Sequence, residues 1–516
     1  MNAIDFFDRS AWLYPDRDLY RLDGHAWSYR KVSLLANRIA HALRAEGVVA
    51  ESKCAVLSRN DPVGFTVLFG VLKAQGAWVP LNVGNGTEEN LHILNLFDAE
   101  VLFFQKEFEE FATTAKQTLP QIRQFVCLDG KTSLGPSFEE WIEGHPTDPI
   151  DLAWDPDGVC MVRGTGGTTG RPKGVMNTNR NLTTMVANYL ANLRFEGPPV
   201  YLACAPLSHA AGIFALPIIA LGGTIVIHRK VDSQAILQSI EKDRISVLYM
   251  PPTALYRLLA EPNARDFDYS SLRHFIYGAA PTAAAKLQEA VAVFGPVMTQ
   301  GYGQTEVPSS VTFLSPEDHL DADGRVNERR LLSCGRPTPF ARVRLVDHND
   351  EPVEQGQIGE IVVQGGLVMK GYYKNPKATS ETIRDGWHHT GDLAYQDEEG
   401  FIYIQDRKND MIISGGFNIY PLEVEQVVLS HPAVQDCAVI GVPDQQWGEA
   451  VLAAVELKVG QDATDAELIA LCKEKIGSIK APKRVEFFDS LPRSAVGKVM
   501  RKEVRKRYWD DGVRQV

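Results

Sequence analysis

A run of glycines, threonines and a lysine near residue 170 carries the sharpest chemical signal in the sequence. It extends from Thr165 to Gly174 and reads TGGTTGRPKG. Glycines let a backbone approach an anion and turn its N–H groups toward it, while hydroxyls add donors and Lys173 adds a positive charge. The pattern differs from the common P-loop and from the dinucleotide fingerprint. We predict a phosphate cradle made by Thr165, Gly166, Gly167, Thr168, Thr169, Gly170 and Lys173.

This loop resembles the signature of the adenylate-forming enzymes, the superfamily of acyl-CoA synthetases, beetle luciferases and peptide-synthetase adenylation domains. Further motifs follow in the family's order over nearly the whole chain. The resemblance implies three small-molecule partners, which are a carboxylic acid, ATP and coenzyme A. It also implies Mg²⁺ as a cofactor.

The segment from Gly301 to Glu306 combines three residue types that suit a nucleotide. An aromatic ring can stack on adenine, a hydroxyl can bond a phosphate, and a carboxylate can hold Mg²⁺, which prefers oxygen ligands. By resemblance these residues are Tyr302, Thr305 and Glu306, with Glu306 as the metal ligand.

Three other motifs complete the nucleotide site by resemblance. The small residues Gly278, Ala279 and Ala280 match the loop that lines the adenine. Asp392 matches the carboxylate that accepts the ribose hydroxyls, and Arg407 matches the arginine that binds the ribose.

The C-terminal part matches the family's moving parts. Lys498 aligns with the catalytic lysine, Asn409 with the hinge, and the pair Gly415 and Gly416 with the tunnel for the pantetheine arm of CoA. The resemblance implies two arrangements of this domain. One inserts Lys498 for adenylation, and the other rotates about Asn409 and opens the thiol channel past Gly416. The expected catalytic residues are Lys498, Thr305, Glu306 and His209.

The segment around His209 resembles the family's acyl pocket, where this residue is a wall or gate beside the reacting carboxylate. A hydrogen-bonded core histidine is the alternative. Relatives that select amino acids carry an aspartate at the position of Ala210. Alanine cannot neutralise an ammonium group, so an amino acid substrate is disfavoured. Relatives specific for the shortest acids carry a tryptophan at the position of Gly303, so we expect a deeper pocket here. The expected pocket residues are His209, Ala210, Gly212, Ile213, Phe214, Gly303 and Pro308.

These features predict an ATP-dependent acid–thiol ligase that forms an acyl-CoA through an acyl-adenylate. The substrate class expected is a medium- or long-chain fatty acid or a related monocarboxylic acid. An aryl-acid CoA ligase and a stand-alone adenylation enzyme that loads an acyl carrier protein remain alternatives.

Three positions depart from the family pattern: Gly164 replaces an aromatic residue, Asn409 replaces Asp or Lys, and Phe417 replaces a frequent Glu.

The elements that must position these motifs alternate between helix and strand. Helical spacing at 31–46 and 61–75 is followed by the apolar runs 54–57 and 77–81, and similar runs recur at 200–203, 224–228, 247–250 and 274–277. Such alternation predicts parallel sheets covered by helices. Strand runs at 343–346 and 359–363 predict a small β unit, and the last hundred residues predict a mobile α+β domain. We place the domains at 1–408 and 409–516.

The net charge, the cysteine content and the apolar segments of the chain argue against several classes of protein. The 516 residues include 53 Lys and Arg against 65 Asp and Glu, and this net charge of -12 disfavours a nucleic-acid binder. Seven scattered cysteines predict a reducing, cytoplasmic compartment. The N-terminus lacks a signal peptide pattern. The apolar stretch 210–227 contains Pro217 and a double glycine, so we expect a buried helix, turn and strand. Peripheral membrane contact and a homodimer remain open.

Overall fold

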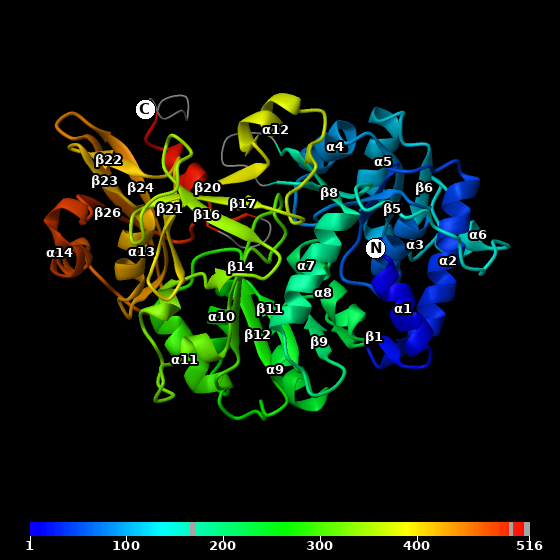
Figure 1. The fold of residues 1–516 in the computed structure, drawn as a ribbon, viewed down its shortest axis with the longest axis horizontal. Helices are drawn as coiled ribbons and strands as arrows, with labels where there is room; N and C mark the ends of the chain where they lie inside the picture. The colour runs from blue at the N-terminus through cyan, green and yellow to red at the C-terminus, as the bar shows by residue number, and fades with distance from the viewer. Residues whose placement is uncertain (166–171, 495–498, 510–516) are drawn as a thin grey trace.

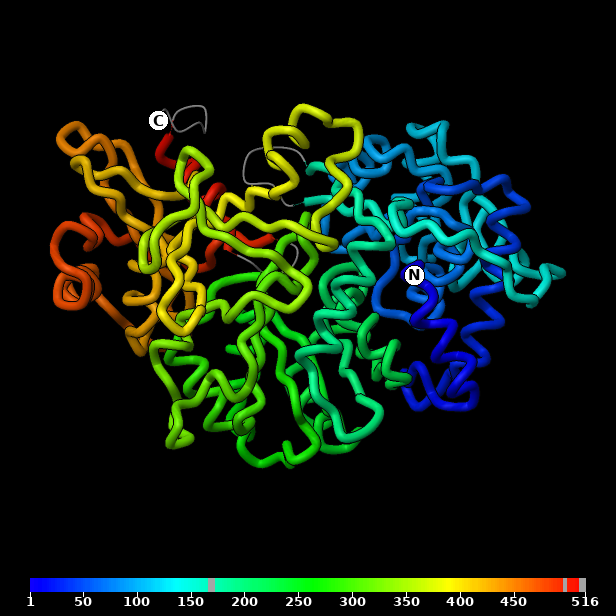
Figure 2. Tube along the Cα trace, viewed as in Figure 1, coloured from blue at the N-terminus to red at the C-terminus, as the bar shows by residue number. Residues whose placement is uncertain are grey.

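The structure is a computed structural model that describes residues 1–165, 172–494 and 499–509. A large α/β part contains two helix-covered sheets and a small β unit, and a smaller domain lies beside it (Figure 1). The chain passes from the N-terminal sheet through the central sheet and the β unit to this small domain, which lies at the opposite end of the molecule from α2 and α6 (Figure 2). The predicted fold class is confirmed.

The central sheet has the strand order β15-β14-β13-β12-β11-β9-β10-β1-β2. Its middle, from β13 to β1, is parallel, and antiparallel pairs close both edges. Carboxyl ends of parallel strands meet at one edge of a sheet, which is where ligands bind in such folds. The strands are β1 (Asp18–Leu22), β2 (His25–Ser28), β9 (Val200–Ala203), β10 (Thr224–Ile227), β11 (Val247–Met250), β12 (His274–Gly278), β13 (Met298–Tyr302), β14 (Thr312–Leu314) and β15 (Arg336–Pro337).

A second sheet, nearer the N-terminus, has the order β18-β8-β7-β4-β3-β5-β6. Its parallel part runs from β7 to β6, while β8 and β18 pair antiparallel. The hairpin of β7 and β8 therefore carries the predicted phosphate loop at its tip. The strands are β3 (Lys53–Leu57), β4 (Ala77–Pro80), β5 (Ala99–Phe104), β6 (Gln124–Cys127), β7 (Val159–Gly164), β8 (Gly174–Thr178) and β18 (Gly371–Tyr372).

Helices cover both sheets, and local sequence explains where they begin. The Asp61 carboxylate accepts the N–H groups of Val63 and Gly64 at the start of α3, and Pro62 suits the first position. The helices of the large part are α1 (Asp5–Leu13), α2 (Tyr29–Ala45), α3 (Pro62–Lys73), α4 (Thr87–Leu96), η1 (Lys106–Phe108), α5 (Glu109–Thr118), α6 (Phe138–Ile142), α7 (Asn179–Asn192), α8 (Ala210–Ala220), α9 (Ser233–Lys242), α10 (Pro252–Leu259), α11 (Ala284–Phe294), η2 (Glu317–His319), η3 (Arg330–Leu332) and α12 (Pro376–Thr382).

The β unit and the small domain follow in the chain. The β unit has the order β16-β17-β20-β19, with β21 on the other side of β20. The small domain has the order β23-β22-β25-β24, with β26 parallel to β25. Their elements are β16 (Arg342–Val346), β17 (Gly359–Gln364), β19 (Ile383–Arg384), β20 (Trp387–Gln396), β21 (Ile402–Arg407), β22 (Ile412–Ser414), β23 (Phe417–Ile419), α13 (Pro421–Leu429), β24 (Val434–Asp444), β25 (Gly448–Leu457), α14 (Asp465–Lys480), β26 (Arg484–Phe488) and α15 (Arg501–Arg505).

Most of the elements predicted from the sequence lie within a few residues of the helices and strands in the structure. In the small domain, α14 extends from Asp465 to Lys480 across a break at Gly477, whose φ is +81°. The apolar stretch 210–227 forms α8, a turn and β10, as predicted. The domain boundary at 408/409 falls between β21 and β22 and stays a prediction.

Burial is consistent with the interpretation of the cysteines. All seven are buried thiols without a disulfide partner, and each lies within the described ranges. Of the helices in residues 1–165, 172–494 and 499–509, none combines the length and apolar character that a bilayer-spanning segment needs.

Candidate active site

The predicted adenine loop and Tyr302 meet because their strands are neighbours. Gly278 ends β12 and pairs in register with Gly301 of β13, so both segments leave the sheet at the same edge. A Cβ added to Gly278 would lie 2.7 Å from the Gly301 carbonyl oxygen, which explains the glycine there. Ala279 follows with a positive φ of 66°, a backbone conformation that is costly for a non-glycine residue and is often found at functional sites.

Asp392 joins this edge to the β unit. Its Oδ2 accepts hydrogen bonds from the Tyr302 hydroxyl at 2.6 Å and from Gln304 Nε2 at 2.7 Å. Arg407 lies opposite Asp392 in the β20–β21 register, with Nε 3.4 Å from Asp392 Oδ1. Burial, followed by the charge of Asp392, raises the pKa of Tyr302 well above its usual range, so the phenol stays a donor. Tyr302, Asp392 and Arg407, which we predicted to bind the adenine and the ribose, are therefore linked by a hydrogen bond and an ion pair.

Glu306 and Lys173 both contact Tyr372, a residue that we did not predict to lie in the site. The Tyr372 hydroxyl donates to Glu306 Oε1 at 2.8 Å, and Lys173 Nζ lies 4.8 Å from the centre of the Tyr372 ring. The contact arises because Tyr372 on β18 pairs with Val175 of β8, close to the phosphate loop. A cation over an aromatic face is favourable. Tyr372 therefore ties the predicted metal ligand to the predicted phosphate lysine.

Arg163 is a second residue that the sequence analysis missed. Its Nη2 donates to the Thr305 carbonyl at 3.3 Å, and its Nε donates to the Asn177 side chain at 3.1 Å. Burial lowers the pKa of Arg163 to about 10, and the charge of Glu306 opposes the shift. An arginine within the apolar run Val159–Gly164 was the signal that could have identified it.

His209 lies past the carboxyl end of β9, at the N-terminal cap of α8. Its Nδ1 is 2.9 Å from the Ser208 hydroxyl. Burial, and then the charge of Arg163, lowers the pKa of His209 to about 4. The imidazole is therefore neutral at physiological pH, which suits a pocket wall better than an acid catalyst.

Two predicted pocket glycines are required by the backbone. A Cβ on Gly212 would lie 1.9 Å from the Leu207 carbonyl oxygen. One on Gly303 would lie 2.6 Å from both the Ser309 nitrogen and the Val307 oxygen. A side chain at position 303 would meet main-chain atoms of the following turn in this backbone, and the expectation that Gly303 deepens the acyl pocket stays a prediction.

Aromatic rings surround the other pocket candidates. Phe214 is buried and lies 4.4 Å, centre to centre, from Tyr249 and 5.3 Å from Tyr189. The Tyr189 hydroxyl donates to the Ser309 carbonyl at 2.7 Å, beside the buried Pro308. Ile213 is also buried, whereas Ala210 is partly exposed. Phe214 was a predicted pocket residue, whereas Tyr189 and Tyr249, which complete this aromatic wall, were not predicted.

Two predicted groups lie outside the described residues. They are Gly166, Gly167, Thr168, Thr169 and Gly170 of the phosphate loop, and the catalytic candidate Lys498. The residues that flank the loop are placed: the Thr165 N–H donates to the Lys173 carbonyl at 3.0 Å and extends the β7–β8 hairpin.

The glycine pair of the predicted CoA tunnel forms a tight hairpin turn. Ser414 pairs with Phe417, and Gly415 and Gly416 between them have φ of +57° and +82°, a left-handed pair that glycine adopts readily. The turn belongs to β22 and β23, which lie on the outer side of the small domain, away from β14 and β17 (Figure 1). The structure therefore does not bring these glycines to the nucleotide residues.

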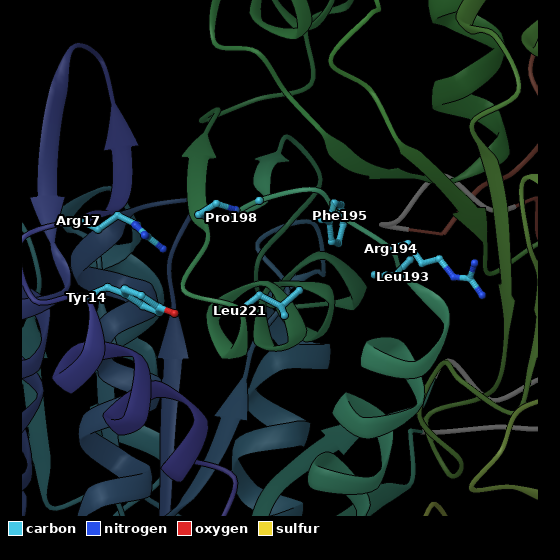
Figure 3. Close-up of a pocket in the computed structure, with 8 residues that line it drawn as sticks. Tyr14, Arg17, Leu193, Arg194, Phe195, Pro198 and Leu221 are labelled. Carbon is cyan, nitrogen blue, oxygen red and sulfur yellow. The ribbon is translucent and has the colours of Figure 1, made fainter.

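A separate pocket of about 460 Å³ lies away from these residues. It opens near Arg17 and Tyr14, beside the α7–β9 connection and the end of α8 (Figure 3). That connection precedes β9, whereas His209 follows it, so the pocket lies toward the opposite edge of the central sheet. Arg17 Nη1 donates to the Gly222 carbonyl at 2.7 Å. We assign no role in the chemistry to this pocket.

Comparison with known proteins covers almost the whole chain. The profile of the AMP-binding enzyme family matches residues 7–373, and that of the AMP-binding enzyme C-terminal domain matches residues 423–498. The medium/long-chain-fatty-acid–CoA ligase FadD8 of Mycobacterium tuberculosis is 45% identical over 500 residues, covering 93% of this chain and 86% of its own. Feruloyl-CoA synthase of an Amycolatopsis species is 38% identical over 502 residues, covering 97% and 98%. The crystal structure of the anthranilate CoA ligase AuaEII with anthranoyl-AMP has a TM-score of 0.89 at 26% identity, covering 98% of this chain and 97% of its own.

Proposed function

Because this chain belongs to the AMP-binding enzyme family, we propose that it activates a carboxylic acid with ATP as an acyl-adenylate and transfers the acyl group to coenzyme A. The observation that carries the proposal is the convergence of Tyr302 and Gln304 on Asp392. Residues ninety positions apart in the sequence are brought together by two different sheets, as a nucleotide site requires.

The nucleotide is bound by groups that are already oriented. Tyr302 offers its ring to adenine, while its hydroxyl and Gln304 hold Asp392 in place. Asp392 and Arg407 face each other across β20 and β21, where they bind the ribose hydroxyls. Orientation by neighbouring side chains lowers the entropic cost of binding.

The adenylation step concentrates negative charge on the α-phosphate when the carboxylate attacks it and pyrophosphate leaves. Lys173, the Thr305 hydroxyl and Lys498 are the groups of this chain that stabilise that charge. Arg163 anchors the Thr305 segment by its carbonyl. A carboxylate nucleophile needs no general base, and His209 is neutral, so it serves as a wall of the acyl site.

Glu306 fits a magnesium ligand. Tyr372 holds its Oε1, and no hydrogen bond from the described residues reaches Oε2. No cluster of three or more potential metal ligands occurs among the described residues, and Mg²⁺ commonly uses one or two carboxylates together with substrate phosphates. When bound, the ion neutralises phosphate charge and orients the leaving pyrophosphate.

The substrate is a medium- or long-chain fatty acid, or a related monocarboxylic acid. Support comes from FadD8 among the relatives and from the aromatic wall of Phe214, Tyr249 and Tyr189. Feruloyl-CoA synthase and the anthranilate ligase keep an aryl acid as the second candidate, since the same wall suits a ring. An acyl carrier protein as thiol acceptor is the third.

The site of action we propose is a reducing, cytoplasmic compartment. The seven buried thiols support it, because disulfides are rare in reducing compartments.

The test is a screen for AMP release with fatty acids from C2 to C18, benzoates and cinnamates. Each acid is assayed with CoA and, separately, with a carrier protein bearing phosphopantetheine. Medium or long fatty acids with CoA should give the highest kcat/KM. Preference for cinnamates would favour the aryl alternative, and acyl transfer to the carrier alone would refute the CoA assignment. Lys498→Ala is the control, and it should abolish acid-dependent pyrophosphate exchange while transfer from a supplied acyl-adenylate continues.

A further inference from the structure

Arg501 begins α15 and binds three carboxylates at once. Its Nη1 donates to Asp406 Oδ1 at 2.8 Å and lies 3.5 Å from Asp410 Oδ2. Its Nε and Nη2 donate to the two carboxylate oxygens of Glu425 at 2.7 and 2.6 Å. Such a paired fork is the strongest geometry available to an arginine.

The three carboxylates lie on different sides of the predicted hinge. Asp406 is on β21, which belongs to the sheet of the β unit. Asp410 follows Asn409, the predicted hinge residue, and Glu425 is on α13 of the small domain. The ion pair between Arg501 and Asp406 therefore crosses the hinge, whereas the other two lie within the small domain.

Asp406 makes a second contact across the same boundary. Its Oδ2 accepts the N–H of Leu422 at 2.8 Å, in the first turn of α13, where a carboxylate satisfies an otherwise unbonded helix donor. The Asp406 side chain is only 4% exposed. A rotation of the small domain about Asn409 must therefore break both contacts and separate Asp406 from its two partners.

Two arginines with ionic partners lie on either side of Lys498 in the sequence. Arg501 lies three residues beyond Lys498 in the sequence. On the other side, Arg493 forms ion pairs with Asp436 at 2.6 Å and Glu456 at 3.0 Å, and it pairs with Val499 in a β-bridge. Both described ends of this segment are thus fixed by buried or half-buried arginines.

Arg501 keeps its charge in this environment. Burial opposes ionisation, but Glu425 and Asp406 outweigh it and raise the pKa of Arg501 well above its usual range. Loss of one carboxylate leaves the arginine held by the others, so a single neutral substitution can test one contact at a time. Removing the arginine itself would strand buried carboxylates and endanger the fold.

We propose that Arg501 is a positioning residue that, through Asp406, holds the small domain in the arrangement used for adenylation, and that this ion pair separates before thiol transfer. The inference rests on the proposed function. We assign the present arrangement to adenylation because β22 and β23, whose connecting turn holds the Gly415–Gly416 pair expected to serve thiol transfer, lie on the side of the small domain away from β14 and β17 (Figure 1).

The experiment compares two isosteric variants of the full chain. Asp406→Asn removes the carboxylate across the hinge, and Asp410→Asn removes one on the same side as Arg501. Each variant is assayed for acid-dependent pyrophosphate exchange and for acyl transfer to CoA from a supplied acyl-adenylate. Asp406→Asn should lower exchange about tenfold, as expected for a lost charged hydrogen bond, and should leave transfer unchanged or faster. Asp410→Asn should change both half-reactions by the same factor.

Three results would overturn the proposal or its premise. Equal loss of both half-reactions in Asp406→Asn, or the same split in Asp410→Asn, would refute the role of the cross-hinge pair. Wild-type protein that shows no exchange with any acid would instead refute the proposed function, and the positioning role with it. The two failures are distinguishable because the first leaves wild-type exchange intact.

A fluorescence measurement adds a test in the wild-type background that does not depend on how well Asp406→Asn folds, and a second test in the variant itself. Trp154→Cys and Val459→Cys place dyes on highly exposed positions, 74% and 103% accessible, on the large part and the small domain. The seven natural cysteines are buried and should not label. In otherwise wild-type protein, a stable acyl-adenylate analogue with CoA should change the energy transfer, and Asp406→Asn should show the changed state without ligands. No ligand-dependent change in the wild-type background would refute the proposal.

Discussion

Removal of the Tyr372 hydroxyl is the most direct test of the site geometry. Tyr372→Phe removes the donor to Glu306 Oε1, a bond of 2.8 Å, and keeps the ring beneath Lys173 Nζ. Glu306 then loses the contact that orients it. We expect adenylation to slow and the Mg²⁺ concentration for half-maximal exchange to rise, because the carboxylate must be ordered by the ion itself.

The size of the effect follows from the type of bond. A hydrogen bond to a charged group contributes about 1.5–3 kcal/mol. Glu306 is partly exposed, which favours the lower value. About 1.5 kcal/mol corresponds to roughly a tenfold fall in kcat/KM for ATP. Tyr372→Leu also removes the ring beneath Lys173, so it should lose about a further 0.5–1 kcal/mol.

The adjacent residue supplies a matched control. The Tyr373 hydroxyl also donates to a carboxylate, Asp98, at 2.7 Å, but it does so away from Glu306. Pyrophosphate exchange is measured at a series of ATP and Mg²⁺ concentrations for Tyr372→Phe and Tyr373→Phe. Equal effects in the two variants, or a Tyr372→Phe variant with wild-type kcat/KM and Mg²⁺ dependence, would refute the orienting role of Tyr372.

Three further predictions follow from the structure. Arg163→Met should lower kcat for adenylation about tenfold with a smaller change in KM, because a buried donor to Thr305 is lost; unchanged exchange kinetics would contradict this. Gly303→Ala should lower the melting temperature and the activity with all acids together, since the added Cβ meets main-chain atoms; a shifted chain-length preference with unchanged stability would contradict this. The free energy of unfolding should fall as pH drops from about 6.5 to about 4, because burial lowers the pKa of four histidines to about 4 in the folded chain. The unfolded chain binds those protons first, which costs roughly 2 kcal/mol of stability for each histidine by pH 5. A melting temperature that is flat over this range would contradict the prediction. The histidines are His209, His274, His319 and His388.

The sequence predicted elements and motifs well where the signal is local. The apolar run 247–250 is β11, and the run 274–277 lies within β12. Parallel strands also explain why distant motifs meet, since Gly278 and Gly301 leave neighbouring strands at one edge. Regular alternation of helix and strand was enough to predict the parallel sheets on which this edge depends.

The sequence could not predict partners that depend on how separate units pack. Tyr372 reaches Glu306 because β18 adds to the edge of β8, a pairing between segments about two hundred residues apart. Arg501 reaches Asp406 only when the small domain rests against β21. No periodicity or spacing encodes either contact, because both depend on tertiary and interdomain packing rather than on local propensity.

Glycine shows where a resemblance needs structural correction. The family pattern made Gly303 a measure of pocket depth, but the backbone of Val307 and Ser309 already fills the space that a side chain would take. We therefore propose that side chains, rather than Gly303, set the preferred chain length. Phe214 and Tyr249 are candidates, since their rings lie 4.4 Å apart, centre to centre, with planes tilted by 30°, and Tyr189 bonds to Ser309 in the turn after Gly303. We propose that an acyl chain entering past His209 meets these aromatic rings, so that specificity depends on how the rings pack.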